Sequence, residues 1–162
     1  MGTNTKNEKR VMEAARHLVR AIAGSARAVE ASSGISGAQL FLLGQLDGAE
    51  GPLSVGELAE LTFTHQSTVS GVVSALVARG LVTRRPAPAD ARRVDIALTA
   101  SGRSLLAHAP ITVQSQLIRG LGRLDHDTRA ALADALEAWL AECGLGGQPA
   151  PLFFEHEDVE SP

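Results

Sequence analysis

Cysteine and long apolar runs are scarce in this sequence, and each scarcity excludes something. The single cysteine, Cys143, rules out a disulfide within the chain and is typical of a reducing compartment. No apolar run approaches the roughly 20 residues of a membrane-spanning helix, and the polar residues 1–6 are not followed by the apolar segment of a signal peptide. We therefore expect a cytoplasmic globular protein in which Cys143 is a small buried apolar residue.

Catalytic and metal-binding motifs are also missing. The sequence has no G-x-S-x-G motif, no glycine-rich phosphate loop and no convincing catalytic triad. Its five histidines lie far apart and lack the spacing of metal ligands. We expect no enzyme activity, no metal site and no cofactor.

A helix-turn-helix pattern is present in the middle of the chain. Ser54 and Glu57 form a capping box, so a short helix is expected over 55–61. Thr64 ends the three-residue turn that follows and is the expected N-cap of a second helix over 65–79. Two helices joined by so short a turn are typical of this motif.

The second helix has two different faces. Val69, Val72, Val73 and Leu76 recur at helical spacing and predict a stripe that faces a core. The opposite face has short, uncharged, hydrogen-bonding residues, which let a helix approach base edges closely in the major groove. These residues are Gln66, Ser67, Ser70, Gly71 and Ser74. The alternative interpretation is a small polar surface without a binding role.

A two-stranded hairpin is predicted after this helix. Gly80 is expected to follow the helix end in the left-handed conformation, and alternating apolar residues indicate strands over 81–85 and 94–98. The loop between them, 86–93, contains two prolines and ends in two arginines. A loop that bears arginine suits the minor groove, where narrow A/T-rich stretches concentrate negative potential.

Three runs in this region resemble the signature of MarR-family transcriptional regulators. They are Leu81-Val82-Thr83-Arg84-Arg85-Pro86, Asp90-Ala91-Arg92-Arg93 and Leu98-Thr99-Ala100-Ser101-Gly102, and they occur in the order and at the spacing of the family's motifs. With the flanking helices, the resemblance covers about residues 8–143. It implies a mainly α fold with a small β-hairpin wing (α+β), in which a winged helix-turn-helix lobe is joined to a helical dimerisation region.

The resemblance also implies roles for individual residues. Arg92 and Arg93 would form the DNA-binding wing, and Asp90 would support the wing by pairing with an arginine. Many relatives have arginine or lysine where this chain has Gly71, so a contact that they make to DNA is expected to be missing here. Five polar residues would lie on or beside the DNA-reading face of the second helix: Gln66, Ser67, Thr68, Ser70 and Ser74.

Charge is unevenly distributed, although the net charge is −3. Residues 62–98 contain five arginines and two aspartates, an excess of three positive charges, whereas residues 150–162 contain four acidic residues and no lysine or arginine. Because attraction to phosphate decays over about 8 Å at physiological salt, DNA is expected to bind at the basic segment. The acidic tail has a composition typical of disorder, and we expect it to compete with DNA for the basic surface.

Four further helices are expected outside the helix-turn-helix. The first covers about 8–31, and a capping box at Ser36 opens a second that is too apolar to be exposed. A long helix over 100–122 is expected to kink near Pro110, because an internal proline removes one hydrogen bond and costs about 3 kcal/mol or more. Asp125 is the expected N-cap of the last helix.

The outer helices carry more apolar surface than one lobe can cover. The natural partner is a second copy of the chain in a two-fold homodimer. The resemblance also implies such a dimer, and with it an inverted-repeat operator in double-stranded DNA whose half-sites lie about one helical turn apart. The expected interface residues are Val11, Leu18, Leu132, Leu136, Trp139 and Leu140.

Control by a small molecule is a further expectation from the resemblance. Members of the family often bind anionic aromatic molecules between the dimerisation helices and the DNA-binding lobe. Arg84 lies at a position that matches a ligand-contacting arginine in some relatives, and Arg16, Arg20 and His17 could also meet a carboxylate. The alternative role for Arg84 is a contact to phosphate or to a neighbouring carboxylate.

Together these observations divide the chain into four parts. They are an N-terminal dimerisation helix (1–34), a winged helix-turn-helix lobe (35–98), C-terminal dimerisation helices (99–145) and an acidic tail (146–162). The expected function is that of a homodimeric, sequence-specific transcriptional regulator, a repressor that a ligand releases from a palindromic operator. The alternative is a winged-helix module for protein interactions, or a scaffold, without specific DNA binding.

Overall fold

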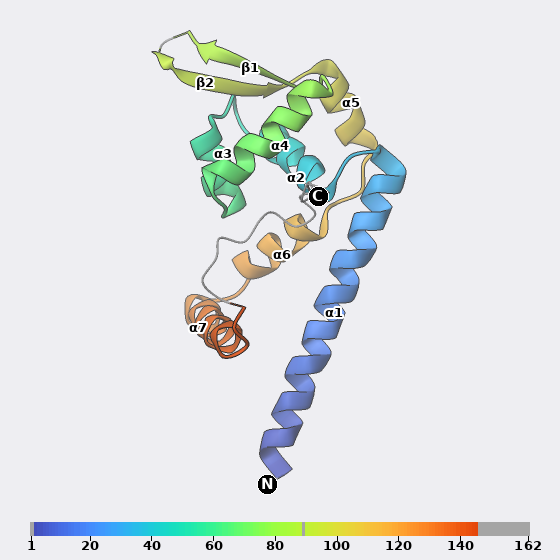
Figure 1. Cartoon of the computed structure of the whole chain (residues 1–162), viewed down its shortest axis with the longest axis vertical. Helices are drawn as coiled ribbons and strands as arrows, with labels where there is room; N and C mark the ends of the chain where they lie inside the picture. The colour runs from blue at the N-terminus through green and yellow to red at the C-terminus, as the bar shows by residue number, and fades with distance from the viewer. Residues whose placement is uncertain (1, 89, 146–162) are drawn as a thin grey trace, which may run out of the picture.

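The computed structural model describes residues 2–88 and 90–145, except for the side chains of 2–4, 90 and 91. In chain order its elements are α1 (Gly2–Ser33), α2 (Gly37–Asp47), α3 (Val55–Thr62), α4 (Gln66–Ala78), β1 (Val82–Ala87), β2 (Asp90–Leu98), α5 (Ala100–His108), α6 (Val113–Gly122) and α7 (His126–Glu142). Figure 1 shows α1 as a long helix with α2–α5 and the hairpin gathered at its C-terminal end. The expected fold class, mainly helical with a hairpin wing, is confirmed. Among the described helices, none has the length and apolarity to cross a membrane.

We call α2–α5 and the hairpin the lobe. The hydrophobic core lies in the lobe, and α2 runs through that core. Leu40, Phe41, Leu42 and Leu43 are each at most 1% exposed, although they are consecutive in sequence. A helix with apolar residues on all sides is stable only when it is surrounded. Here α3, α4, α5 and the hairpin surround it together with the end of α1, which confirms the expectation that this helix is buried.

At α2, α3 and α7, side-chain caps begin the helix at the residue that the sequence predicts. The Ser54 Oγ accepts from the Glu57 N–H at 3.2 Å, and the Glu57 carboxylate accepts from the Ser54 N–H at 2.7 Å. The capping box at Ser36 has the same reciprocal pair, and Asp125 accepts from the N–H of the third residue of α7. Each cap satisfies amides that would otherwise lack a partner in the first turn.

The predicted cap at Thr64 is wrong. The N-cap of α4 is His65, and Thr64 belongs to the end of α3, because its N–H donates to the Ala59 carbonyl at 3.0 Å. Its hydroxyl then turns inward, where it is buried without a hydrogen-bond partner among the described residues.

The hairpin is longer than predicted and its loop is shorter. The strands pair antiparallel from Val82 opposite Leu98 to Pro86 opposite Val94, so most of the expected loop 86–93 is strand. Both strands of a two-stranded sheet are edge strands, and proline is accepted there. At the base of the hairpin, Ile96 exchanges two backbone hydrogen bonds with Leu53, of 2.8 and 3.0 Å, which tie β2 to the segment before α3.

A close approach of two backbones joins α5 to the turn after α4. Gly80 has a φ of 69°, as expected for the left-handed residue after α4. A Cβ on Gly102 would lie 2.1 Å from the Leu81 carbonyl oxygen, so only glycine fits there. The Thr99 hydroxyl accepts from the Gly102 N–H and donates to the Gly80 carbonyl at 2.8 Å. This contact is the physical reason for the Leu-Thr-x-x-Gly pattern.

The expected single helix over 100–122 is instead two helices. Ala109, which precedes Pro110, is extended with a ψ of 150°, as steric contact with a following proline favours. Thr112 then caps α6 by accepting from the Ser115 N–H at 3.2 Å. A proline and a strong new cap only two residues apart end the helix rather than kink it.

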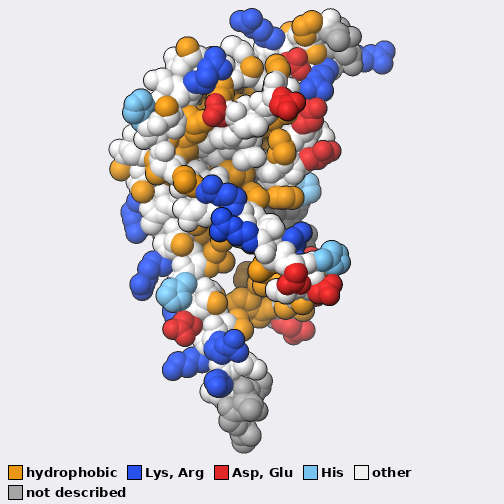
Figure 2. Space-filling view, turned by 180° about the vertical axis from the view of Figure 1, so that it is seen from behind, with side chains coloured by type: hydrophobic (Ala, Val, Ile, Leu, Met, Phe, Trp, Pro, Cys, Tyr) orange, Lys and Arg blue, Asp and Glu red, His pale blue; other side chains and the backbone are white. Residues whose placement is uncertain are grey.

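The helices outside the lobe are far less covered. Only the C-terminal part of α1 reaches the core, where Val29 is fully buried. None of the residues of α7, all of which are described, is buried, and Figure 2 shows apolar side chains gathered over it. Cys143 is exposed as well, so its assignment as a buried residue is wrong for the single chain.

Candidate nucleic-acid interface

The exposed face of α4 has the small polar character that the sequence indicates. Its buried stripe, Val69, Val72, Val73 and Leu76, is at most 4% exposed. The opposite side of the helix carries no charged residue and bears Gln66, Ser67, Gly71 and Ser74 as exposed residues, with Thr68 and Ser70 half-buried. The Ser74 hydroxyl donates to the Ser70 carbonyl at 2.8 Å, which leaves its lone pairs free to accept. Such a face can approach base edges without a long side chain in the way.

The N-terminal end of α4 is open. Among the described residues, no side chain accepts from the first amides of this helix, since His65 makes no capping bond. The Gln66 side chain instead lies over the start of α3, with its Nε2 3.3 Å from where a Cβ on Gly56 would be. Unpaired amides and the positive end of the helix dipole favour an anionic group such as a phosphate.

Arg93 holds the base of the hairpin to α3. Its guanidinium donates to both Glu57 carboxylate oxygens, at 2.9 and 3.1 Å, and to the Asp95 carboxylate at 2.9 Å. Hydrogen bonds from Ser54, and then from Arg93, keep the pKa of Glu57 below its usual value of 4.5. Hydrogen bonds to Asp95 and Glu57 raise the pKa of Arg93. We call Arg93, Glu57 and Asp95 the hairpin clamp.

The hairpin clamp changes what is expected of the wing. The guanidinium donors of Arg93 are directed at Asp95, Glu57 and the Pro52 carbonyl, so this residue supports the hairpin. The side chain of Asp90, which was expected to give that support, lies outside the described residues. Sequence reasoning missed the clamp because Arg93 and Glu57 are 36 residues apart and belong to two different motifs.

The hairpin carries exposed arginines on both strands. Arg84 and Arg85 lie on β1 and Arg92 on β2, and all three are exposed. Arg79 donates to the Gly34 carbonyl at 2.7 Å and thereby ties the end of α4 to the end of α1. Figure 2 shows Lys and Arg side chains around the hairpin end of the lobe. In Figure 1 the tip of the hairpin and the N-terminal end of α4 both lie on the side of the lobe away from α1.

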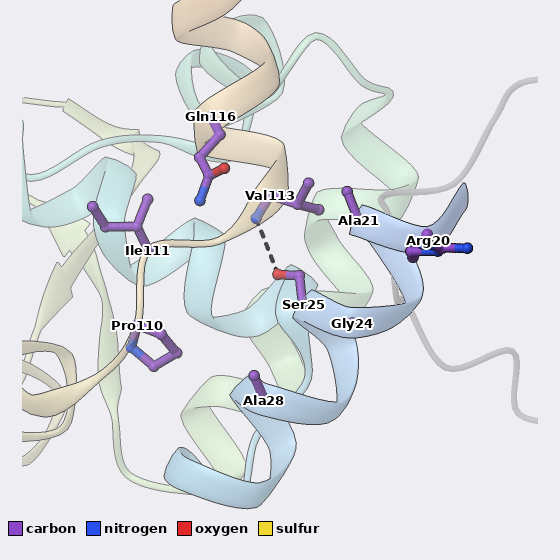
Figure 3. A pocket seen from close by; sticks show the side chains of 9 residues that line it. All are labelled: Arg20, Ala21, Gly24, Ser25, Ala28, Pro110, Ile111, Val113 and Gln116. Atoms are coloured by element: carbon purple, nitrogen blue, oxygen red, sulfur yellow. Dashed lines mark hydrogen bonds between the residues drawn. The ribbon is translucent and has the colours of Figure 1, made fainter. Parts of the chain in front are cut away.

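The four residues expected to meet a ligand carboxylate are not brought together within one chain. A cavity of about 300 Å³ lies between α1 and the break that precedes α6. Arg20 lines it, together with Ser25, Ile111 and Gln116, and the Ser25 hydroxyl accepts from the Val113 N–H at 3.1 Å. In Figure 3 Arg20 extends away from the other lining residues. Arg16 and His17 are exposed on α1 outside the cavity, and Arg84 lies on the hairpin.

The residues expected at a dimer interface are exposed apolar side chains in the single chain. Their exposed fractions lie between 38% and 48%. They come from both ends of the sequence: Val11 and Leu18 from α1, and Leu132, Leu136, Trp139 and Leu140 from α7.

Known proteins share this sequence pattern. The model of the MarR family matches residues 33–93. The chain is 40% identical over 83 residues to the HTH-type transcriptional repressor NicR of Pseudomonas putida, over 51% of this chain and 52% of NicR. It is 32% identical over 110 residues to the HTH-type transcriptional regulator Mb0904 of Mycobacterium bovis, over 68% of this chain and 76% of that protein. The chain thus spans about half the length of NicR and three quarters of Mb0904.

A solved structure shares the fold. BpsR of Bordetella bronchiseptica, whose DNA binding is regulated by 6-hydroxynicotinic acid, is 26% identical to this chain with a TM-score of 0.50. The match covers 82% of this chain and 94% of BpsR.

Proposed function

The chain belongs to the MarR family of transcriptional regulators, and on this premise we propose that it is a homodimeric repressor that binds an inverted-repeat operator and is released by a small anionic ligand. The observation that carries the proposal is the exposed face of α4, which is uncharged, small and open at its N-terminal end. It adjoins a hairpin with exposed arginines.

In this proposal α4 enters the major groove and the hairpin reaches the neighbouring minor groove. Gln66 and the hydroxyls of Ser67, Thr68, Ser70 and Ser74 read base edges, and a bidentate contact from Gln66 to adenine would contribute about 1–3 kcal/mol of discrimination. Arg92 is the wing contact, and Arg85 on the other strand adds attraction to phosphate. The hairpin clamp supports the proposal because it fixes the angle between the two reading elements.

The apolar faces of α1 and α7 support the proposal of a dimer. A two-fold pairing of these helices would cover side chains that a single chain leaves about 40% exposed. A two-fold dimer binds two half-sites of opposite direction, about 34–36 Å apart when they are separated by one turn of DNA.

Release by a ligand is supported by the cavity beside α1. Its volume of about 300 Å³ is at the lower end of what small-molecule sites require. Arg20 supplies a positive charge there, and the regulation of BpsR by an anionic aromatic compound is consistent with this chemistry. Arg16, His17 and Arg84 would join the site only through the second protomer.

Footprinting on the DNA upstream of the chain's own gene, at about 0.15 M salt, tests the proposal, because non-specific phosphate binding is already weak there. We expect a protected inverted repeat. Arg92→Ala should weaken binding and lower the slope of affinity against salt by about one unit, whereas Arg119→Ala, on α6, should leave both unchanged. Absence of protection, with weak and salt-insensitive binding to bulk DNA, would instead indicate a protein-interaction module.

A further inference from the structure

The turn between α3 and α4 holds an exposed aromatic residue in a strained conformation. Phe63 has a φ of 53° and a ψ of 43°, which is the left-handed region. Its side chain is 77% exposed, more than that of any other large apolar residue in the described part of the chain. For a bulky residue this conformation is an outlier, and it costs about 1–3 kcal/mol.

The helix ending accounts for the left-handed conformation at position 63, but it does not explain why that residue is phenylalanine. The Phe63 N–H donates to the Glu60 carbonyl at 3.2 Å, and the Thr64 N–H donates to the Ala59 carbonyl at 3.0 Å. This is the helix ending in which glycine is the usual left-handed residue. The chain follows that rule at its three other described left-handed positions, Gly34, Gly80 and Gly144.

Burial of the Phe63 side chain does not offset the strain energy of its backbone either. With most of its ring in solvent, Phe63 gains little from packing within the chain. A strained residue that lacks a packing role is an indication of function at that position. Only Thr64 separates Phe63 from His65, the N-cap of α4, so Phe63 lies two residues from the open end of this helix along the chain.

We propose that Phe63 is a DNA-contacting residue whose ring packs on a thymine methyl group beside the base pairs that α4 reads. The inference rests on the proposed function and extends it. The side chains on the exposed face of α4 are mostly small and polar, and Thr68, the residue of this face that carries a methyl group, is half-buried, so the face offers little apolar surface to a thymine methyl group. An aromatic ring at the helix start supplies that contact, and with 77% of the residue exposed the ring is accessible to DNA.

Phe63→Gly tests the inference because it should raise the melting temperature and lower the affinity for the operator. Glycine relieves the strained backbone, so the melting temperature should rise by about 3 °C. Loss of the ring should weaken binding to the footprinted operator about ten-fold. Phe63→Tyr should keep the affinity, and Leu61→Ala, which removes an apolar residue that is 45% exposed on α3, should not change it.

Operator DNA with uracil in place of single thymines identifies the contact. Removal of one methyl group should weaken wild-type binding about four-fold at one position in each half-site, and the same change should have no effect on Phe63→Gly. A rise in melting temperature with unchanged affinity would overturn the inference while leaving the proposed function intact. So would an affinity loss that no uracil substitution reproduces. Failure of the wild-type chain to bind any operator would overturn both.

Discussion

The lobe and the helices outside it (α1, α6 and α7, the terminal helices) contain similar apolar residues but differ in how far they bury them. Leu42 in α2 is fully buried, whereas Leu136 in α7 is 44% exposed, although both lie on helices with several leucines. The lobe covers its apolar residues with its own elements. The terminal helices do not: Val29 of α1 lies in the core and Ile118 of α6 packs against it, whereas no residue of α7 is buried. The comparison indicates that the lobe buries its apolar residues within one chain, whereas the terminal helices leave apolar residues exposed that the proposed dimer would cover.

The largest effect is expected inside the lobe. Gly102→Ala would place a methyl group 2.1 Å from a backbone oxygen, so α5 must shift and the free energy of unfolding should fall by about 3 kcal/mol. Gly120→Ala is the matched control on α6, where a Cβ would meet nothing within 4 Å, and it should stabilise by up to about 1 kcal/mol. Urea denaturation at a fixed protomer concentration measures both. Equal effects would contradict the distinction between the two regions.

An intermediate effect is expected at the surface of α7. Leu136→Asp should raise the dissociation constant of the dimer about 30-fold or more, because it places a charge in an apolar interface. Leu61→Asp makes the same change at a residue of equal exposure, 45%, on the lobe and should leave the dimer intact. Sedimentation velocity over a dilution series distinguishes them. If Leu136→Asp leaves the assembly unchanged, α7 is not its interface.

The smallest effect is expected at the hairpin clamp, and it depends on pH. Because the folded pKa of Glu57 lies below its unfolded value of 4.5, the carboxylate contributes stability above pH 4.5, and this contribution is lost as the pH falls through the folded pKa. Glu57→Gln should therefore lower the melting temperature at pH 7, and its difference from wild type should shrink as the pH falls below 4.5.

Glu60→Gln, which removes the same charge elsewhere on α3, is the control for that titration. It should lower the melting temperature at pH 7 less than Glu57→Gln does. A constant gap between Glu57→Gln and wild type at all pH values would show that the clamp does not depend on the charge of Glu57.

Local features of the fold could be predicted from the sequence, and contacts between distant residues could not. Caps at Ser54 and Asp125 depend on residues three apart, so the pattern itself specifies them. The extent of the hairpin depends on pairing across strands, and the two prolines of 86–93 indicated a loop where edge strands accept proline.

The candidate site shows the same division. The small polar face of α4 follows from helical spacing, whereas the partners of Arg93 come from segments that meet only in the folded lobe. The exposure of Cys143 could not be predicted, because its surroundings depend on what covers α7.

The hairpin clamp has a consequence for operator length. Since it joins the hairpin to α3, and α3 leads directly into α4, we expect the two elements proposed to read DNA to move as a unit. The extended residues 109–112 lie between this unit and α6, and rotation there would change the distance between two lobes without altering either. An effector acting on such a dimer would therefore alter the number of base pairs that it tolerates between half-sites and leave the sequence preference of each half-site unchanged.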